Sequence, residues 1–210
     1  MSILRRSLRV SRDIGLVAVA TGLAASTPAF AQITAVPITP TIPVKIAEKT
    51  ISVKHVSIDL PVDFDQFNRN FTYLLGRFDP SDFDLAVKNP KHGFERLKAA
   101  AGDQGLMLFE GTNNHGILFA TIGQSRKALR YHIGNPQIAL KMTVHNIGAA
   151  LYAPLTVLVY EVGENHIRVE YDKPSSVFGQ FNEPDIDAIT AVLDIKLNNL
   201  LYRAAELKPE

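Results

Sequence analysis

The chain has 210 residues, of which 46% are hydrophobic and 20% are charged, a balance that excludes a largely disordered protein and allows one buried core. It contains no cysteine, which excludes disulfides, thiolate metal sites, a lipid anchor on cysteine and a cysteine nucleophile. The formal net charge is only +1.

Residues 1–31 have the pattern of a signal peptide. A start with four arginines precedes the apolar run "IGLVAVATGLAAS", and Ala29 and Ala31 provide small residues for cleavage after Ala31. The run is too short to span a bilayer, and no later stretch is long and apolar enough. We therefore expect a periplasmic or secreted protein that is soluble after cleavage. Arg5-Arg6 leaves the twin-arginine route open beside the general secretory route.

Cleavage would remove four arginines and one aspartate, which changes the net charge from +1 to −2. A slightly acidic chain gives no electrostatic reason to expect nucleic acid or an anionic membrane as a partner. Residues 32–50, with Pro37, Pro40 and Pro43, favour an extended tether. A single domain is expected from 51 to 205, and 206–210 are expected to be a disordered tail.

The sequence of the first half of the domain predicts a strand followed by a helix. "ISVKHVSIDL" has strand composition, and its alternation slips near Lys54-His55, where we expect a β-bulge. Asp63 and Gln66 form a capping box before an amphipathic helix. Its apolar stripe is expected to pack in the core and consists of Phe64, Phe67, Phe71, Leu75 and Phe78.

Asn89-Pro90 predicts the cap and first residue of a shorter helix that ends at Gly102. "DPSDFD" at 79–84 is interpreted as turn and capping residues, because the glycine and distal glutamate of a calcium loop are missing. "GLMLFEG" predicts a strand. "HGILFATIG" is ambiguous between strand and helix, and we favour a helix.

In the second half of the domain, the alternation of apolar and polar residues is clearer. "ALRYHI" predicts a strand, "PQIALKMTVH" a helix of about two turns, and "APLTVLVYE" with "HIRVEY" a hairpin. "DKPSS" is expected to leave the last strand by a proline turn. Apolar residues from Ile186 to Ala204 predict a long amphipathic helix over 184–205. The order indicates an α+β fold whose helices cover one face of a mainly antiparallel sheet.

The stretches "YHIGNPQIALKMT", "LYAPLTVLVYE" and "VEYDKPSS" resemble the family known as domain of unknown function 302, over most of residues 51–205. The resemblance implies a two-layer α/β sandwich of order β-α-β(4)-α, in the class of the TATA-binding protein, with extra short helices as insertions. It implies no activity, and no functional residue can be carried over. The chain departs from simpler members by its leader, its tether and the "FDPSDFDLAVKNPKHG" insertion.

Residues 134–136 are the first candidate site. Gly134 would let the backbone reverse, and Asn135 would cap the helix that starts at Pro136, which leaves amides where an anion could bind. Lys141 lies in that helix and His132 in the preceding strand. A simple helix cap is the favoured interpretation, and an anion site is the alternative.

Alternation places the second candidate on the sheet face away from the helices. That face would carry Arg130 and His132 from one strand and His166, Arg168 and Glu170 from another. "TVLVY" is apolar on both sides, which favours a solvated face or a dimer interface over a ligand site. His115 is a loop histidine that could be reactive, although a lone loop histidine is usually only solvated.

Motifs for metal binding and catalysis are missing from the sequence. The six histidines are dispersed without a ligand spacing, and no catalytic triad, phosphate loop or dinucleotide fingerprint is present. We predict no metal and no cofactor. The leading hypothesis is a non-enzymatic domain that self-associates through its sheet and binds a small anionic ligand or an envelope protein. The alternative is an acid–base enzyme that uses His132 or His166 with Glu170 on an anionic substrate.

Overall fold

The structure is a computed structural model that describes residues 35 and 37–208. The expected signal peptide lies outside the described residues. Residues 37–47 belong to a unit separate from the domain, and residues 37–50 are exposed and have neither helix nor strand. No helix of the described part is both long enough and apolar enough to cross a membrane.

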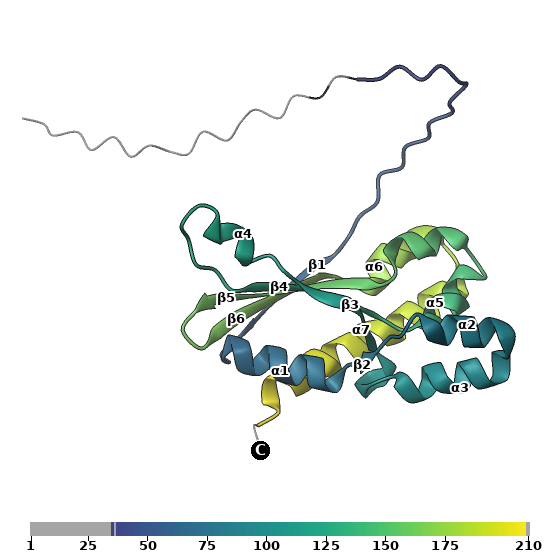
Figure 1. The fold of residues 1–210 in the computed structure, drawn as a ribbon. Coiled ribbons are helices and arrows are strands. Elements are labelled where there is room, and N and C mark those ends of the chain that lie inside the picture. Colours follow the sequence, from purple (N-terminus) through teal and green to yellow (C-terminus); the bar gives the residue numbers. More distant parts are fainter. Residues whose placement is uncertain (1–34, 36, 209–210) are drawn as a thin grey trace, which may run out of the picture. The chain divides into compact units, whose positions relative to one another are not determined.

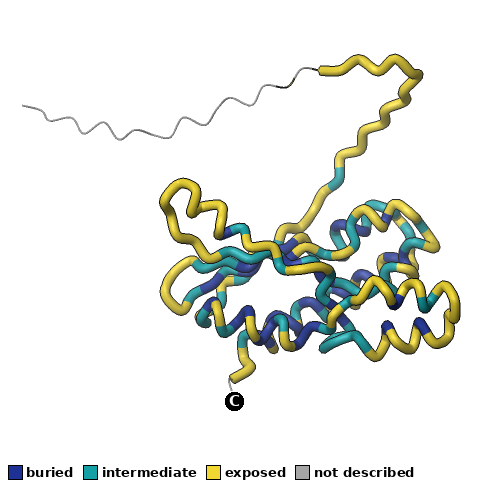
Figure 2. The backbone as a smooth tube through the Cα atoms, in the orientation of Figure 1, coloured by how far each residue is buried: buried dark blue, intermediate teal, exposed yellow. Residues whose placement is uncertain are grey.

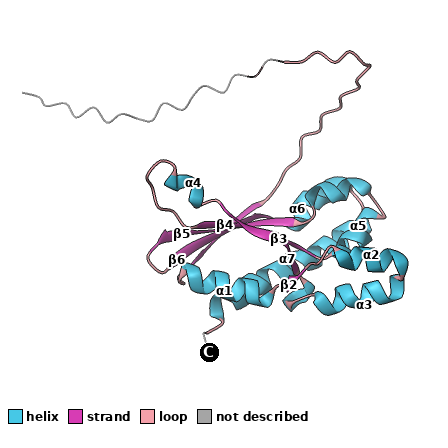
Figure 3. Ribbon diagram, in the orientation of Figure 1, coloured by secondary structure: helices cyan, strands magenta, loops and turns pink. Residues whose placement is uncertain are grey.

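The domain is built around one six-stranded sheet, whose strand order is β1-β6-β5-β4-β3-β2. Figures 1 and 3 show this sheet with its helices. The strands are β1 (His55–Leu60), β2 (Gly76–Arg77), β3 (Met107–Asn114), β4 (Ala128–Gly134), β5 (Leu155–Gly163) and β6 (His166–Asp172). All neighbours pair antiparallel except β2 and β3, which pair parallel. The two-layer α+β architecture inferred from the sequence is confirmed.

Seven helices connect or cover these strands in the described part. They are α1 (Phe64–Leu74), α2 (Ser81–Lys88), α3 (Pro90–Ala100), α4 (Ile117–Ala120), α5 (Pro136–Thr143), α6 (Pro174–Phe178) and α7 (Pro184–Glu206). Short 3-10 turns lie at Asp103–Gly105, Ile147–Tyr152 and Gly179–Phe181. Helices α1 and α7 lie across one face of the sheet (Figure 1).

Helix α1 forms as its capping residues predict, because the Asp63 carboxylate accepts a hydrogen bond from the Gln66 amide at 2.7 Å. The second half of the capping box is not made, since the Gln66 side chain donates instead to Asn70. Phe64, Phe67 and Phe71 are buried as predicted, whereas Phe78 lies beyond β2 and outside the helix.

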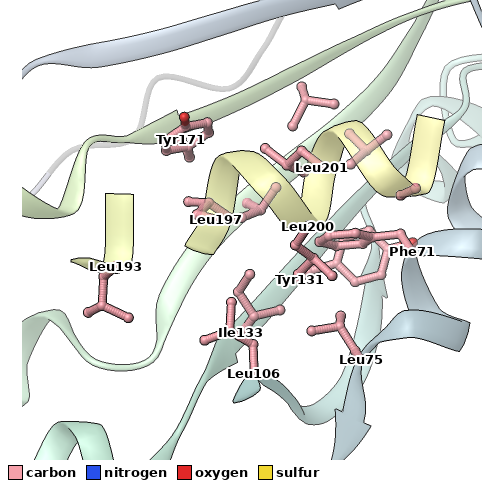
Figure 4. Packing of buried hydrophobic residues seen from close by; sticks show 14 of the residues in the cluster. Phe71, Leu75, Leu106, Tyr131, Ile133, Tyr171, Leu193, Leu197, Leu200 and Leu201 are labelled. Atoms are coloured by element: carbon pink, nitrogen blue, oxygen red, sulfur yellow. The ribbon is translucent and has the colours of Figure 1, made fainter. Parts of the chain in front are cut away.

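The core lies between the sheet and α1 and α7. Tyr131, Ile133 and Val157 are fully or almost fully buried on the inner face of the sheet, and Figure 2 shows the buried positions along the strands and α7. Phe71 and Tyr131 pack edge to face with ring centroids 5.1 Å apart, close to Leu200 of α7 (Figure 4). This layer fixes which side chains of each strand point away from the helices.

Three local predictions are wrong, and one is right only in part. Strand β1 begins at His55 and pairs with β6 without a register shift, so residues 51–54 precede the strand and no bulge forms there. In "DPSDFD" the Asp79 carboxylate accepts from the Ser81 amide, as expected of a capping residue, but residues 81–84 already belong to helix α2. "DKPSS" leads into helix α6. Gly134 remains in strand β4 without a positive φ, so the chain passes into α5 without a glycine-dependent reversal.

Candidate functional site

Asn135 fixes the start of α5, as its place before proline predicts. Its side-chain oxygen accepts from the amides of Gln137 at 2.8 Å and Ile138 at 3.3 Å. Its side-chain amide donates to the carbonyl of Gly105 at 2.8 Å, which ties the helix start to the turn before β3. Because the cap uses two of the amides that an anion would need, the helix-cap interpretation is the better supported one.

Beside this helix start lies a cavity of about 440 Å³, which we call the large cavity. It is open to solvent and is bounded by α2, α3, α5, Phe109 of β3, the end of β4, the loop before β5, and buried side chains of α6 and α7. Its apolar lining comes mainly from Phe83, Val87, Phe94, Leu97, Phe109, Ile138, Ala139, Met142, Leu155, Phe178 and Leu193. The volume lies within the range of about 300 to 1,000 Å³ that is usual for small-molecule sites.

The α2–α3 hairpin forms one wall of the large cavity and is held together by its own contacts. A Cβ atom on Gly93 would lie 2.2 Å from the Cα of Ala86, so the two helices approach as closely as only a glycine allows. The nearly buried Asp82 carboxylate pairs with Arg96 at 3.2 Å. The hairpin is therefore braced internally, while Phe83 and Val87 remain partly or largely exposed.

Aromatic rings continue from this wall to the sheet. Phe78 stacks on Phe109 with centroids 4.5 Å apart and lies 4.9 Å from the ring of Phe83. On the opposite wall, Ala139 leaves space that a longer side chain would fill, and Ala153 joins Pro154 through a cis peptide bond. The site thus combines aromatic surface with small residues, which suits an apolar ligand.

Polar groups at the large cavity are few. Asn135 and Thr143 line it, and both use their side chains for bonds to the backbone. No titratable side chain is among the residues that line it. The large cavity can therefore bind by burying apolar surface, but it offers no group for proton transfer.

A second cavity of about 340 Å³, the small cavity, lies between α5 and α7. Ile138 and Leu193 line both cavities, so these two side chains lie at the boundary between them. The remaining lining residues are Lys141, Ala188, Ile189, Val192 and Lys196. Of the eight candidate site residues, Asn135 thus lies at the large cavity and Lys141 at the small one.

The outer face of the sheet carries a polar cluster, here called the outer-face cluster: His55, Asp59, Tyr160, Arg168, Glu170 and Asp172. Nδ1 of His55 lies 3.0 Å from a carboxylate oxygen of Asp172, and its Nε2 lies 3.7 Å from Glu170. The Tyr160 hydroxyl donates to Glu170 at 2.8 Å. Arg168 binds both oxygens of Asp59, at 2.8 and 3.1 Å.

These contacts shift proton affinities on the outer face. The hydrogen bond to Asp172 raises the pKa of His55, and the nearby charges of Asp172 and Glu170 act in the same direction. The hydrogen bond from Arg168 lowers the pKa of Asp59. Desolvation, reinforced by the bond to Glu170, raises the pKa of Tyr160.

The predicted histidine–carboxylate pair is not formed on this face. His132 lies across from Thr156 and Phe109, whereas Glu170 lies two strands away on β6. Within the described part of the chain, neither His132 nor His166 is a hydrogen-bond or ion-pair partner of Glu170, and His55 occupies that place. His115 lies in the turn that follows β3.

Arg130 shares the outer face with these residues and lies across from Leu158. Its Nε atom is buried and has no hydrogen-bond partner among the described residues. Among residues 35 and 37–208, no group of three or more histidine, aspartate or glutamate side chains is arranged to hold a metal ion.

Sequence reasoning missed the large cavity because one of its walls, helix α2, was interpreted as a turn. A signal was present in the sequence, since Phe83 and Val87 are spaced four residues apart, as on one face of a helix. It also missed His55, because the expected bulge removed that residue from the alternation of β1.

Comparison with known proteins agrees with this architecture. Residues 84–204, more than half of the chain, match the family described as "Domain of unknown function DUF302". A solved structure is also similar, that of an uncharacterized conserved protein DUF302 from Bacillus stearothermophilus. It shares 17% identity at a TM-score of 0.50, over 71% of this chain and 97% of that one. At this identity the likeness concerns the fold alone. No curated protein matches the chain.

Proposed function

Because this chain belongs to the DUF302 family, whose description assigns no activity, we propose its function from its geometry: a non-enzymatic domain that binds a small apolar ligand in the large cavity. The observation that carries the proposal is a volume of about 440 Å³ lined by aromatic and aliphatic side chains next to a braced hairpin. Burial of apolar ligand surface supplies about 25 cal/mol per Å², which is sufficient for binding without charged contacts.

A neutral fluorescent probe, N-phenyl-1-naphthylamine, tests the proposal in a titration followed by fluorescence. Ala139→Phe places a ring in the large cavity, and we expect it to abolish the increase in probe fluorescence. Ala191→Phe is the matched control, because Ala191 is exposed on α7 and lines neither cavity. Equal probe binding by both variants, or none by the unaltered protein, would contradict the proposal.

Self-association through the outer face of the sheet is a second, separate part of the proposed function. Leu158 is half-buried at the centre of this face, between Arg130 and Glu170 on the neighbouring strands. Tyr160 lies two residues further along the same strand. An apolar centre with a charged rim is the usual arrangement of a protein interface. An envelope protein is the alternative partner for the same face.

Sedimentation velocity of residues 32–210 tests this part. We expect a concentration-dependent dimer that Leu158→Lys shifts to monomer, and the exposed Val162→Lys on the same strand serves as control. A monomer at all concentrations would reject self-association. A pull-down from periplasmic extract with the same variants distinguishes the envelope-protein alternative.

Export to the periplasm or medium, with cleavage after Ala31, completes the proposal. Its support is the basic start, short apolar run and Ala29-Phe30-Ala31 sequence at the N-terminus. Intact mass measurement of protein from cell fractions provides the test. A full-length product in the cytosolic fraction would reject it.

A further inference from the structure

Two lysines face the small cavity between α5 and α7. Lys141 is exposed near the end of α5, whereas Lys196 is half-buried on α7. The Lys196 ammonium donates to the carbonyl of Gln104 at 2.5 Å, which holds this cation in place. An ammonium group has three donors, so this bond leaves two for another acceptor.

Neither lysine is neutralised by the protein within the described residues. Neither Lys141 nor Lys196 has a carboxylate within 4.0 Å, whereas seven other cationic side chains among the described residues, two of them histidines, do. Three acidic residues on the surrounding elements are paired elsewhere: Asp103 with Arg203, Asp194 with Lys173, and Asp185 with His145. The small cavity therefore combines an apolar floor with two uncompensated positive charges.

The small cavity adjoins the large one. Ile138 of α5 and Leu193 of α7 contribute to both. A ligand that fills the large cavity with an apolar chain would pass these two side chains and reach the lysines. A polar head at that point would remain near solvent, since Lys141 is exposed.

We propose that the ligand is a monomeric, single-chain anionic amphiphile: its hydrocarbon chain lies in the large cavity, and its carboxylate is bound by Lys141 and Lys196. This assignment rests on the proposed apolar-ligand function and adds the chemical class of the ligand. A carboxylate matches the donors on charge, because two ammonium groups offer point charges to an acceptor-only group. The hydrocarbon chain matches the apolar lining.

Three ligands with the same ten-carbon chain test the assignment by isothermal titration calorimetry: decanoate, decanol and decyltrimethylammonium. The two ionic ligands are used below their critical micelle concentrations, and decanol is used below its solubility limit. We expect the unaltered protein to bind decanoate at least about fivefold more tightly than decanol, from two partly exposed charge contacts. We expect decyltrimethylammonium to bind most weakly. Higher ionic strength should reduce the preference for decanoate, since exposed charges are screened.

The lysine variants distinguish the contribution of the ligand's charge from that of its hydrocarbon chain. Lys141→Gln with Lys196→Gln should reduce the affinity for decanoate to that for decanol and leave decanol unchanged. Lys141→Glu alone, at an exposed position that should not affect folding, should weaken decanoate binding further and strengthen decyltrimethylammonium binding. Lys98→Gln, at an exposed position on α3 that is part of neither lining, is the control and should change nothing.

The outcomes distinguish this inference from the function on which it rests. If decanoate and decanol bind equally and the lysine variants change neither affinity, the anionic class is wrong while apolar-ligand binding stands. If none of the three ligands binds, both the anionic ligand class and the apolar-ligand function are rejected. If decanoate binds more tightly but Ala139→Phe leaves it unchanged, the chain does not occupy the large cavity and the assignment is overturned.

Discussion

The two ends of the helical layer differ in how they are filled. Where α1 and α7 cross the sheet, Phe67, Phe71 and Leu197 are fully buried, and the ring of Phe71 packs against both Phe67 and Tyr131. Where α2, α3 and α5 lie, side chains of similar apolarity enclose a cavity of about 440 Å³. The same kind of residue thus builds a close-packed core at one end and a hollow at the other.

From this contrast we expect the α1–α7 end to contribute more to stability than the end that carries the large cavity. Interiors are normally packed to crystal density, because empty space forfeits dispersion contacts. The large cavity is open to solvent and leaves apolar side chains such as Val87 exposed to water, which is unfavourable unless a ligand covers them. The predictions below test whether the two ends differ in this way.

The largest effect is expected from truncation in the packed end. Phe71→Ala should lower the free energy of unfolding by about 3 to 5 kcal/mol, because it removes a fully buried ring in contact with Phe67 and Tyr131. Phe94→Ala at the large cavity should cost less than about 1 kcal/mol, since Phe94 is 39% exposed. Urea denaturation measures both. Equal losses would show that the two ends contribute alike.

Enlargement of a side chain should show the same contrast with a smaller magnitude. Ala204→Phe in the packed end should destabilise by about 1 to 3 kcal/mol or more, because Ala204 is completely buried. Ala139→Phe should change the unfolding free energy by less than about 1 kcal/mol, since the ring enters existing space. Thermal unfolding in the absence of ligand compares them. A large loss for Ala139→Phe would mean that the cavity cannot accept a ring.

The packed end was also the part that the sequence predicted well. The periodicity of α1 and α7 and the alternation of β4, β5 and β6 reflect one buried face each, so local pattern and tertiary burial agree. The cap at Asn135 followed from its place before proline. These features depend on residues near one another in the sequence.

The cavity end could not be predicted in the same way. Its walls come from α2, β4, α5 and the segment before β5, and no local pattern reports the space between elements so distant in the chain. The outer-face cluster shows the same limit, because His55 meets Glu170 only through the pairing of β1 with β6. Strand register decides which histidine lies beside which carboxylate.

A buried hydrogen bond offers a sharper test of the packed end. The hydroxyl of Tyr131 donates to Asn68 at 2.5 Å, and the Asn68 amide donates to the carbonyl of Phe64 at 2.6 Å. Burial raises the pKa of Tyr131, so the hydroxyl remains a donor at all ordinary pH values. Tyr131→Phe leaves a buried acceptor unpaired and should cost about 1 to 3 kcal/mol.

The control for this hydrogen bond is Tyr73→Phe, which removes the same hydroxyl from a side chain that is 79% exposed and should have almost no effect. Urea denaturation of both variants at neutral pH gives the difference. If the two substitutions cost the same, the Tyr131–Asn68 bond does not contribute to stability.

The outer face of the sheet should give the smallest effect, and that effect should depend on pH. The pKa of His55 is raised above its unfolded value near 6.5, chiefly by the hydrogen bond to Asp172. A raised pKa in the folded state means that the stabilisation is fully present below pH 6.5 and is lost as the pH rises through the folded-state value. His55 is 58% exposed, so solvent screening limits its contribution to a few tenths of a kcal/mol, about that of a surface ion pair.

His55→Gln should therefore be slightly less stable than the unaltered protein at pH 5.5 and equal to it at pH 8.5. His92→Gln, at an exposed position on α3, should show no such difference. A gap that persists or widens at pH 8.5 would mean that His55 stabilises the fold as a neutral side chain, and that the outer face contributes by packing as the inner face does.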